Sequence, residues 1–125
     1  MSIIRNAALP RAQLPGIDHV TLAGSMNGLQ RFSVWKQTIA PGEASPPHRH
    51  DCEEVIVVQA GRGRLLLDGA EHHFGPDTTL IVPPDVPHQL FNTGDAALEI
   101  IAVLGMTPVE VVFPDGAPLP LPWAS

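Results

Sequence analysis

Residues 42–61 have the sequence GEASPPHRHDCEEVIVVQAG, and residues 54–59 within it are rich in β-branched side chains, which predicts a buried strand. Side chains two positions apart on an extended chain point to the same face, so His48 and His50 are expected to aim at one point. Glu54 has the same parity and joins them if the chain stays roughly extended or bends once after His50. Two imidazoles and a carboxylate at one point form a ligand set for a divalent transition metal.

The size and charge of the chain restrict the classes of protein to consider. Its 125 residues suggest one domain, which is long enough to bury a core without stabilising cross-links such as disulfides. Hydrophobic residues make up 44% and charged residues 16%, as in globular rather than disordered chains. The net charge is −6 and Lys and Arg form no cluster, so no nucleic-acid partner is expected.

The cysteine content and the N-terminus bear on location. Cys52 is the only cysteine, which excludes an intrachain disulfide and fits a reducing, cytoplasmic compartment. Pro10 and Arg11 stand where the apolar segment of a signal peptide would continue, so we expect no secretory signal. No apolar run approaches the roughly 20 residues that span a bilayer, and a membrane partner is therefore not expected.

Turn residues divide the rest of the chain into short segments. With 14 prolines and 11 glycines, no window of helical length shows a clear helical period, and the spacing predicts an all-β sandwich or small barrel. Both faces of residues 31–40 carry apolar groups, so the sequence does not decide which face points inward. Residues 107–125 are a proline-rich tail whose only strand-like part is 109–113. The other expected strands are 17–22, 54–59, 64–67, 71–74, 79–82, 88–92 and 97–104.

At this point the residues resemble the cupin family. Its first motif, G-x5-H-x-H-x(3,4)-E-x6-G, is filled completely between Gly42 and Gly61. The later part of its second motif, G-x5-P-x-G-x2-H-x3-N, is filled from Pro83 through His88 to Asn92.

Two positions of the second motif depart from the family pattern. Asp77 and Asp85 stand where the motif has glycine. Aspartate tolerates turn conformations nearly as glycine does, so these departures weaken the motif only slightly.

The resemblance implies a fold, a cofactor and an assembly. It implies one cupin domain over residues 1–125, a double-stranded β-helix or jelly-roll barrel, with motifs at 42–61 and 77–92. It implies one divalent transition metal ion held by His48, His50, Glu54 and His88, and the ligand types allow iron, manganese, zinc, nickel, cobalt or copper. Small cupins commonly form homodimers by exchanging N-terminal strands, a role open to residues 1–16.

The function expected from such a centre is metal-dependent chemistry. Four protein ligands leave an open position on a five- or six-coordinate metal, which can bind water, dioxygen or a chelating substrate. We therefore expect a small metal-dependent enzyme acting on a small oxygenated organic molecule, dioxygenase-like in the first place, or an isomerase or lyase. The alternative is a non-catalytic small-molecule-binding or sensor cupin. No catalytic acid or base stands out.

Several other residues have simpler expected roles. Glu53 is expected to be a solvated carboxylate that becomes the ligand only if the strand register slips. Arg49 should point away from the histidines, and Cys52 should be a bystander thiol. His72 and His73 should be exposed or lie at the barrel rim, and a structural or interface role is expected for His19. The candidates for a pocket wall, which are equally candidates for barrel core, are Trp35, Gln37, Ile56, Val58, Leu90 and Phe91.

Overall fold

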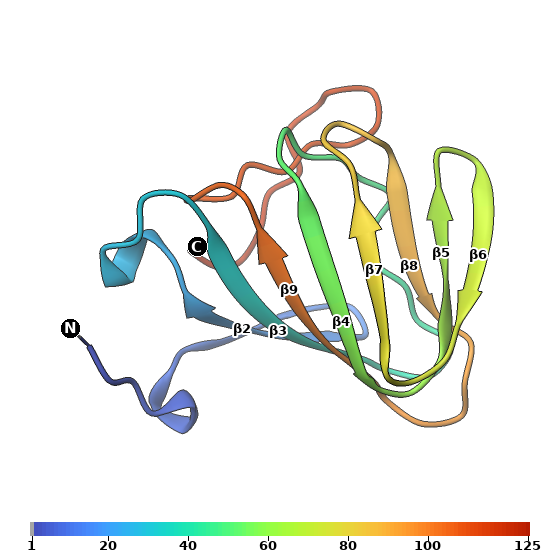
Figure 1. Cartoon of the computed structure of the whole chain (residues 1–125), viewed down its shortest axis with the longest axis horizontal. Helices are drawn as coiled ribbons and strands as arrows, with labels where there is room; N and C mark the ends of the chain where they lie inside the picture. Colours follow the sequence, from blue (N-terminus) through green and yellow to red (C-terminus); the bar gives the residue numbers. More distant parts are fainter. Residues whose placement is uncertain (1) are drawn as a thin grey trace.

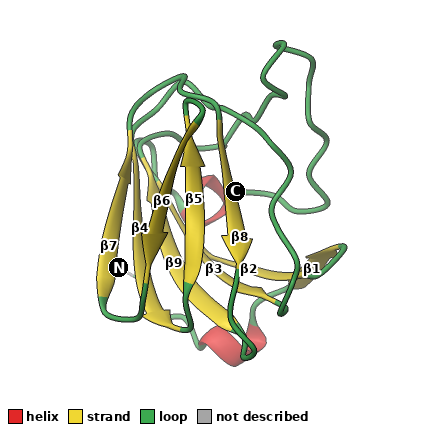
Figure 2. Ribbon diagram, turned by 90° about the vertical axis from the view of Figure 1, so that its right-hand side faces the viewer, coloured by secondary structure: helices red, strands yellow, loops and turns green. Residues whose placement is uncertain are grey.

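The computed structural model describes residues 2–125 as two antiparallel β-sheets packed face to face (Figures 1 and 2). The larger sheet has the strand order β1-β2-β3-β9-β4-β7, and the smaller has the order β6-β5-β8. The strands are β1 (Arg11–Leu14), β2 (Ile17–Ala23), β3 (Ser33–Ile39), β4 (Glu54–Ala60), β5 (Gly63–Leu67), β6 (Ala70–Phe74), β7 (Thr78–Val82), β8 (His88–Asn92) and β9 (Leu98–Leu104). Two short 3-10 helices, Asn6–Ala8 and Ser25–Asn27, precede and follow the β1–β2 hairpin. The all-β jelly-roll prediction is confirmed.

The strand predictions hold with small shifts and one error. Between residues 17 and 104 each expected strand is present within two residues of its expected bounds, and residues 88–92 match β8 at both ends. Residues 109–113 form no regular strand, contrary to expectation. In this segment only Val112 pairs, through isolated bridges with Arg49 and Pro118. Pro108 and Pro114 bound the segment on both sides, so a ladder cannot continue past either end.

The N-terminal strand pairs within its own chain. Arg11 to Leu14 of β1 lie opposite Val20 to Ile17 of β2 in an antiparallel hairpin. Because β1 is the edge strand of the larger sheet, its outer side is open to a further strand. The homodimer with exchanged N-terminal strands stays a prediction, as does the cytoplasmic location. Among residues 2–125 no helix is long and apolar enough to cross a membrane.

The two sheets bury alternate side chains of their strands. In β4, Ile56 and Val58 face inward with Glu54, while Val55 and Val57 are exposed, as the parity predicted. The sequence did not decide which face of β3 points inward. In the structure Trp35 is 6% exposed and lies on the inward side. Its neighbour across the ladder to β9 is the small residue Ala102, which leaves room for the indole.

The two aspartates that replace glycine in the second motif adopt the backbone that the motif requires. Asp77 has φ 57° and Asp85 has φ 58°, both in the left-handed region. Aspartate enters this region more readily than most residues. The departure from the family pattern therefore leaves the turns before and after β7 intact, and with them the position of β8.

The C-terminal tail folds back against the barrel and is anchored at its end. The Ser25 hydroxyl donates to the Ser125 carbonyl over 2.8 Å, and the Thr21 hydroxyl donates to the Ala124 carbonyl over 2.8 Å. Leu121 and Trp123 pack against the hydrophobic core. The tail thereby becomes part of the wall around the candidate site.

Candidate metal centre

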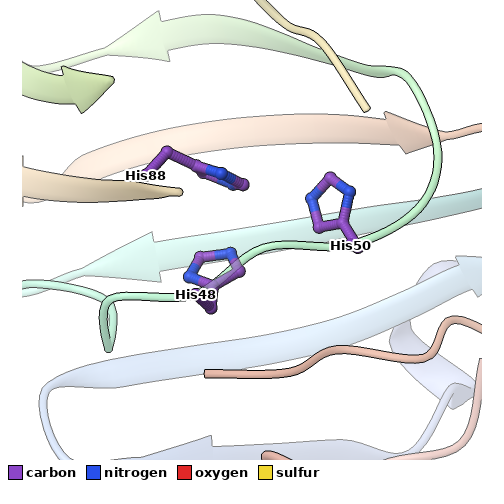
Figure 3. Close-up of side chains that lie close together, drawn as sticks. All are labelled: His48, His50 and His88. Atoms are coloured by element: carbon purple, nitrogen blue, oxygen red, sulfur yellow. The ribbon is translucent and has the colours of Figure 1, made fainter. Parts of the chain in front are cut away.

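Three histidines lie close together (Figure 3). His48 and His50 lie in the loop before β4, and His88 is the first residue of β8. The loop is held to β8 by a backbone pair: the N–H of His48 donates to the carbonyl of His88 over 3.0 Å, and the N–H of His88 donates back over 2.8 Å. Residues 40 positions apart in sequence therefore become direct neighbours.

The three rings are close enough to share one cation. One nitrogen of each ring lies within 4.8 Å of the other two. The ring centroids of His48 and His88 are 4.2 Å apart, and those of His50 and His88 are 5.0 Å apart. His50 is 2% and His88 4% exposed, whereas His48 is half-buried.

Each imidazole is oriented by a backbone carbonyl. In all three rings Nδ1 donates to a carbonyl two residues away, over 2.7, 3.2 and 2.8 Å. These pairs are His48 with Pro46, His50 with Cys52, and His88 with Val86. A hydrogen bond at Nδ1 fixes ring orientation and leaves Nε2 free to bind a metal, as is usual for histidines that bind a metal.

Glu54 joins the histidines from the first position of β4. One of its oxygens, Oε1, lies 3.1 Å from Nε2 of His50 and 3.4 Å from Nε2 of His88. The carboxylate is buried, and burial by itself raises its pKa. The contacts with His50 and His88 outweigh burial and lower the pKa of Glu54 to about 2, so Glu54 is ionised.

The protonation of the histidine rings depends on the same balance between burial and the neighbouring groups. Burial lowers the pKa of His48 to about 4, and the nearby His88 contributes in the same direction. Burial also opposes a charge on His50, but contacts with Cys52 and Glu54 outweigh it and raise the pKa of His50 to about 10. A proton therefore lies between His50 and Glu54 at the place where a cation would bind both.

The donor set fits a divalent transition metal. His88 Nε2 is buried and lies 3.4 Å from Glu54 without an aligned hydrogen bond to any described residue. A buried nitrogen left without a partner is costly, and a bound cation would satisfy it. Imidazole nitrogens with one carboxylate suit zinc, iron, copper, nickel, cobalt or manganese, so the donors do not select one metal.

A cavity of about 50 Å³ opens beside these residues. His48, Glu54 and His88 line it, whereas His50 is not part of its wall. Of the predicted wall residues, Trp35, Gln37, Ile56 and Leu90 line the cavity. The rest of the wall is largely aliphatic and includes tail residues that the sequence did not indicate, namely Leu119, Leu121 and Trp123.

Two predicted wall residues do not line the cavity. Val58 is 1% exposed and belongs to the deeper core. Phe91 has the opposite parity from Leu90 on β8, and the guanidinium of Arg64 lies 4.1 Å from its ring centroid. The even spacing of Val58 from Glu54 indicated the correct face of the strand, but not that Val58 lies in the core rather than on the cavity wall.

The remaining residues are placed largely as expected. Glu53 is exposed and points away from the centre, which leaves Glu54 as the inward carboxylate. Arg49 points outward and pairs with Asp85 over 2.9 Å. His72 and His73 are exposed on β6.

Cys52 is more involved than a bystander. It is 6% exposed, its Sγ lies 3.4 Å from Nδ1 of His50, and its carbonyl accepts the hydrogen bond from the same ring nitrogen. Backbone roles of this kind, like those of Pro46 and Val86, leave no signal in side-chain identity. They depend only on the path of the loop.

Residues 1–124 match a family model described as auxin binding protein. The chain belongs to the auxin-binding protein family. It is 36% identical to auxin-binding protein T85 of Nicotiana tabacum over 96% of this chain and 72% of that protein.

Solved structures show the same fold. A sugar phosphate isomerase of the cupin superfamily from Silicibacter pomeroyi superposes with a TM-score of 0.75 at 22% identity, over 99% of this chain and all of that one. A polyketide cyclase from Streptomyces resistomycificus superposes with a TM-score of 0.73 at 24% identity, over 90% and 86% of the two chains. The predicted cupin barrel is therefore confirmed for this member of the auxin-binding family.

Proposed function

We propose that this protein binds small organic acids at a divalent transition metal. In this proposal His48, His50 and His88 supply three ring nitrogens and Glu54 supplies a carboxylate oxygen. The observation that carries it is the shared arrangement of the three rings: each is oriented through Nδ1 by a backbone carbonyl, and a nitrogen of each lies within 4.8 Å of the others.

Charge favours an anionic ligand. Three neutral imidazoles and one carboxylate would leave a divalent ion with a net charge near +1, in a site shielded from water, where electrostatic attraction is stronger than at a surface. The metal would supply a Lewis acid for a carboxylate oxygen. The aliphatic and aromatic wall beside it would pack against the organic part of the acid.

The relatives narrow the class of acid. Four relatives that match over 84% or more of this chain are named auxin-binding proteins. Indole-3-acetate, a carboxylic acid with an apolar ring, is therefore included among the ligands to test. The cavity of about 50 Å³ beside the proposed ligand set suits a small acid. A bicyclic acid would require the wall to widen.

A metal-dependent enzyme, dioxygenase-like or an isomerase or lyase, is the second candidate. It is favoured by the position of His48, Glu54 and His88 on the cavity wall, since a substrate there would reach the metal directly. Binding ranks first because, among the described residues, the cavity wall has no titratable side chain outside the ligand set. A proton-transfer reaction would have to use a metal ligand as its acid or base.

Metal content and ligand binding test the proposal together. The protein is purified without chelator or nickel resin, and its metal is measured by elemental mass spectrometry. Acetate, glycolate and indole-3-acetate are then titrated calorimetrically into metal-loaded and chelator-treated protein. We expect close to one equivalent of metal, and binding of at least one acid only in the loaded form. Metal-independent binding, or no uptake of any of the six metals, contradicts the proposal.

A further inference from the structure

A chain of hydrogen bonds runs from the C-terminal tail to the cavity wall, and its direction is set at the tail. The Thr21 hydroxyl lies 2.8 Å from the Ala124 carbonyl. A backbone carbonyl can only accept, so the single hydroxyl proton of Thr21 is used there. Nε2 of His19 lies 2.8 Å from the same hydroxyl oxygen and must therefore be the donor.

His19 is held as a neutral ring. It is 1% exposed, stacks on Trp123 with centroids 3.7 Å apart, and meets the edge of Trp35 at 5.0 Å. Its two polar neighbours, Thr21 and Gln37, carry no charge. Burial lowers the pKa of His19 to about 4, in keeping with this uncharged surrounding. A neutral ring with its proton on Nε2 has a bare Nδ1, which is an acceptor.

The bare Nδ1 decides the orientation of Gln37. The side-chain nitrogen of Gln37 lies 3.0 Å from Nδ1 of His19 and donates to it. If the amide were turned over, its oxygen would face the lone pair of Nδ1 at this distance, and two acceptors would repel. The carbonyl end of the amide has no hydrogen-bond partner among residues 2–125, and Gln37 lies on the wall of the metal cavity.

We propose that Gln37 presents its carbonyl oxygen to the cavity as a hydrogen-bond acceptor, and that the acid bound there carries an O–H group for it, as 2-hydroxy acids do. His19 and Thr21 are then positioning residues, which act on the ligand through the orientation of Gln37. The ligand class rests on the proposed function, whereas the orientation of the amide does not.

The orientation is measured without any ligand. Nitrogen-15 NMR of the zinc-loaded protein distinguishes the two neutral tautomers of His19, because a bare and a protonated ring nitrogen resonate far apart. We expect a bare Nδ1 coupled across the hydrogen bond to the side-chain nitrogen of Gln37. A proton on Nδ1 at neutral pH overturns the proposal whether or not any acid binds.

The ligand class is measured with two acids of nearly equal shape. Glycolate and propionate differ by an O–H in place of a methyl group, and both are titrated into the wild type and Gln37→Leu. The hydroxyl also approaches the metal, but that contribution is present in both proteins and cancels in the comparison. We expect the preference for glycolate to fall roughly 2- to 10-fold in Gln37→Leu, as for one lost hydrogen bond. An unchanged preference overturns the ligand class.

Thr21 supplies matched variants for the positioning role. Thr21→Val removes the hydroxyl at nearly constant volume, so nothing forces the proton of His19 onto Nε2, whereas Thr21→Ser retains the hydroxyl. We expect Thr21→Val to lose both the bare Nδ1 signal and the glycolate preference, and Thr21→Ser to keep both. If neither acid binds the wild type, the ligand class is wrong, and the NMR result alone decides the orientation of Gln37.

Discussion

His48 and His88 are joined by a reciprocal pair of backbone hydrogen bonds of 3.0 and 2.8 Å, so the loop before β4 is fixed to the first residue of β8. This pair places an imidazole of the loop and an imidazole of the smaller sheet with ring centroids 4.2 Å apart. The backbone thus fixes the relative positions of the two rings. A site arranged in this way would bind a cation at a lower entropic cost.

His88→Ala is expected to weaken metal binding while the barrel stays folded. The variant loses one ring nitrogen but keeps the backbone pair with His48. Loss of an outer hydrogen-bond partner costs roughly 10- to 100-fold in metal affinity, and loss of a direct ligand should cost at least as much. Metal content and calorimetric affinity give the result, and circular dichroism checks the fold.

The matched control for this variant is His72→Ala, since His72 is exposed on β6 far from the centre. Its metal content should equal that of the wild type. Unchanged metal affinity in His88→Ala would show that the four-ligand assignment is wrong.

The adjacent carboxylates Glu53 and Glu54 give a second comparison. Glu54→Gln removes the negative charge that lies 3.1 Å from His50 and 3.4 Å from His88, so metal affinity should fall by roughly 10-fold or more. Glu53→Gln changes an exposed side chain and should leave the affinity unaltered. Titration of both variants with the same metal gives the answer. Equal losses would mean that overall charge, and not coordination by Glu54, determines affinity.

Gly61 closes the turn after β4 and is expected to tolerate no side chain. Its φ is +86°, and a Cβ there would lie 2.6 Å from the Ala97 carbonyl oxygen. Gly69 has a similar φ of +81° but open space around it. Gly69→Ala should therefore cost about 1–2 kcal/mol of unfolding free energy from backbone strain alone. Gly61→Ala should cost more, because the carbonyl must also move.

Urea unfolding monitored by tryptophan fluorescence measures both glycine variants. If the two alanines cost the same, the close approach of Ala97 to Gly61 has no energetic weight and strain at φ explains the whole effect.

The grouping of these four residues followed from the sequence because it depends on side-chain spacing. The even parity of His48, His50 and Glu54 indicated one shared face, and the motif around His88 added the fourth residue, while their role as metal ligands stays a prediction. The inward face of β3 did not follow, since Val34 and Trp35 are both apolar and the choice is made by pairing with β9. Local patterns contain no information about such long-range pairing.

The sequence also did not predict that the tail forms part of the cavity wall, because this too depends on long-range contacts. Residues 107–125 have no period that assigns a face. Their position depends on contacts between residues at least 100 positions apart, such as Ser25 with Ser125 (100 positions) and Thr21 with Ala124 (103 positions). His19 carried no motif, so its place between Trp35 and Trp123 became visible only when the tail was in position.

His19 predicts a specific pH dependence of stability. Burial lowers its pKa to about 4 in the folded protein, against 6.5 for the ordinary side chain. Between these values the unfolded chain takes up a proton that the folded protein does not, so this contribution is complete above pH 6.5 and is lost as the pH falls toward 4. The full loss is about 3 kcal/mol, and roughly 2 kcal/mol of it should be reached by pH 5.

Unfolding free energies from urea titrations at pH 7.5 and 5 are compared for wild type, His19→Gln and His72→Gln. His19→Gln is expected to be less stable at pH 7.5 but to lose less on acidification, whereas His72→Gln should follow the wild type. An equal acid-induced loss in wild type and His19→Gln would mean that His19 is not held neutral by the fold, and that other buried groups such as His48 account for the loss.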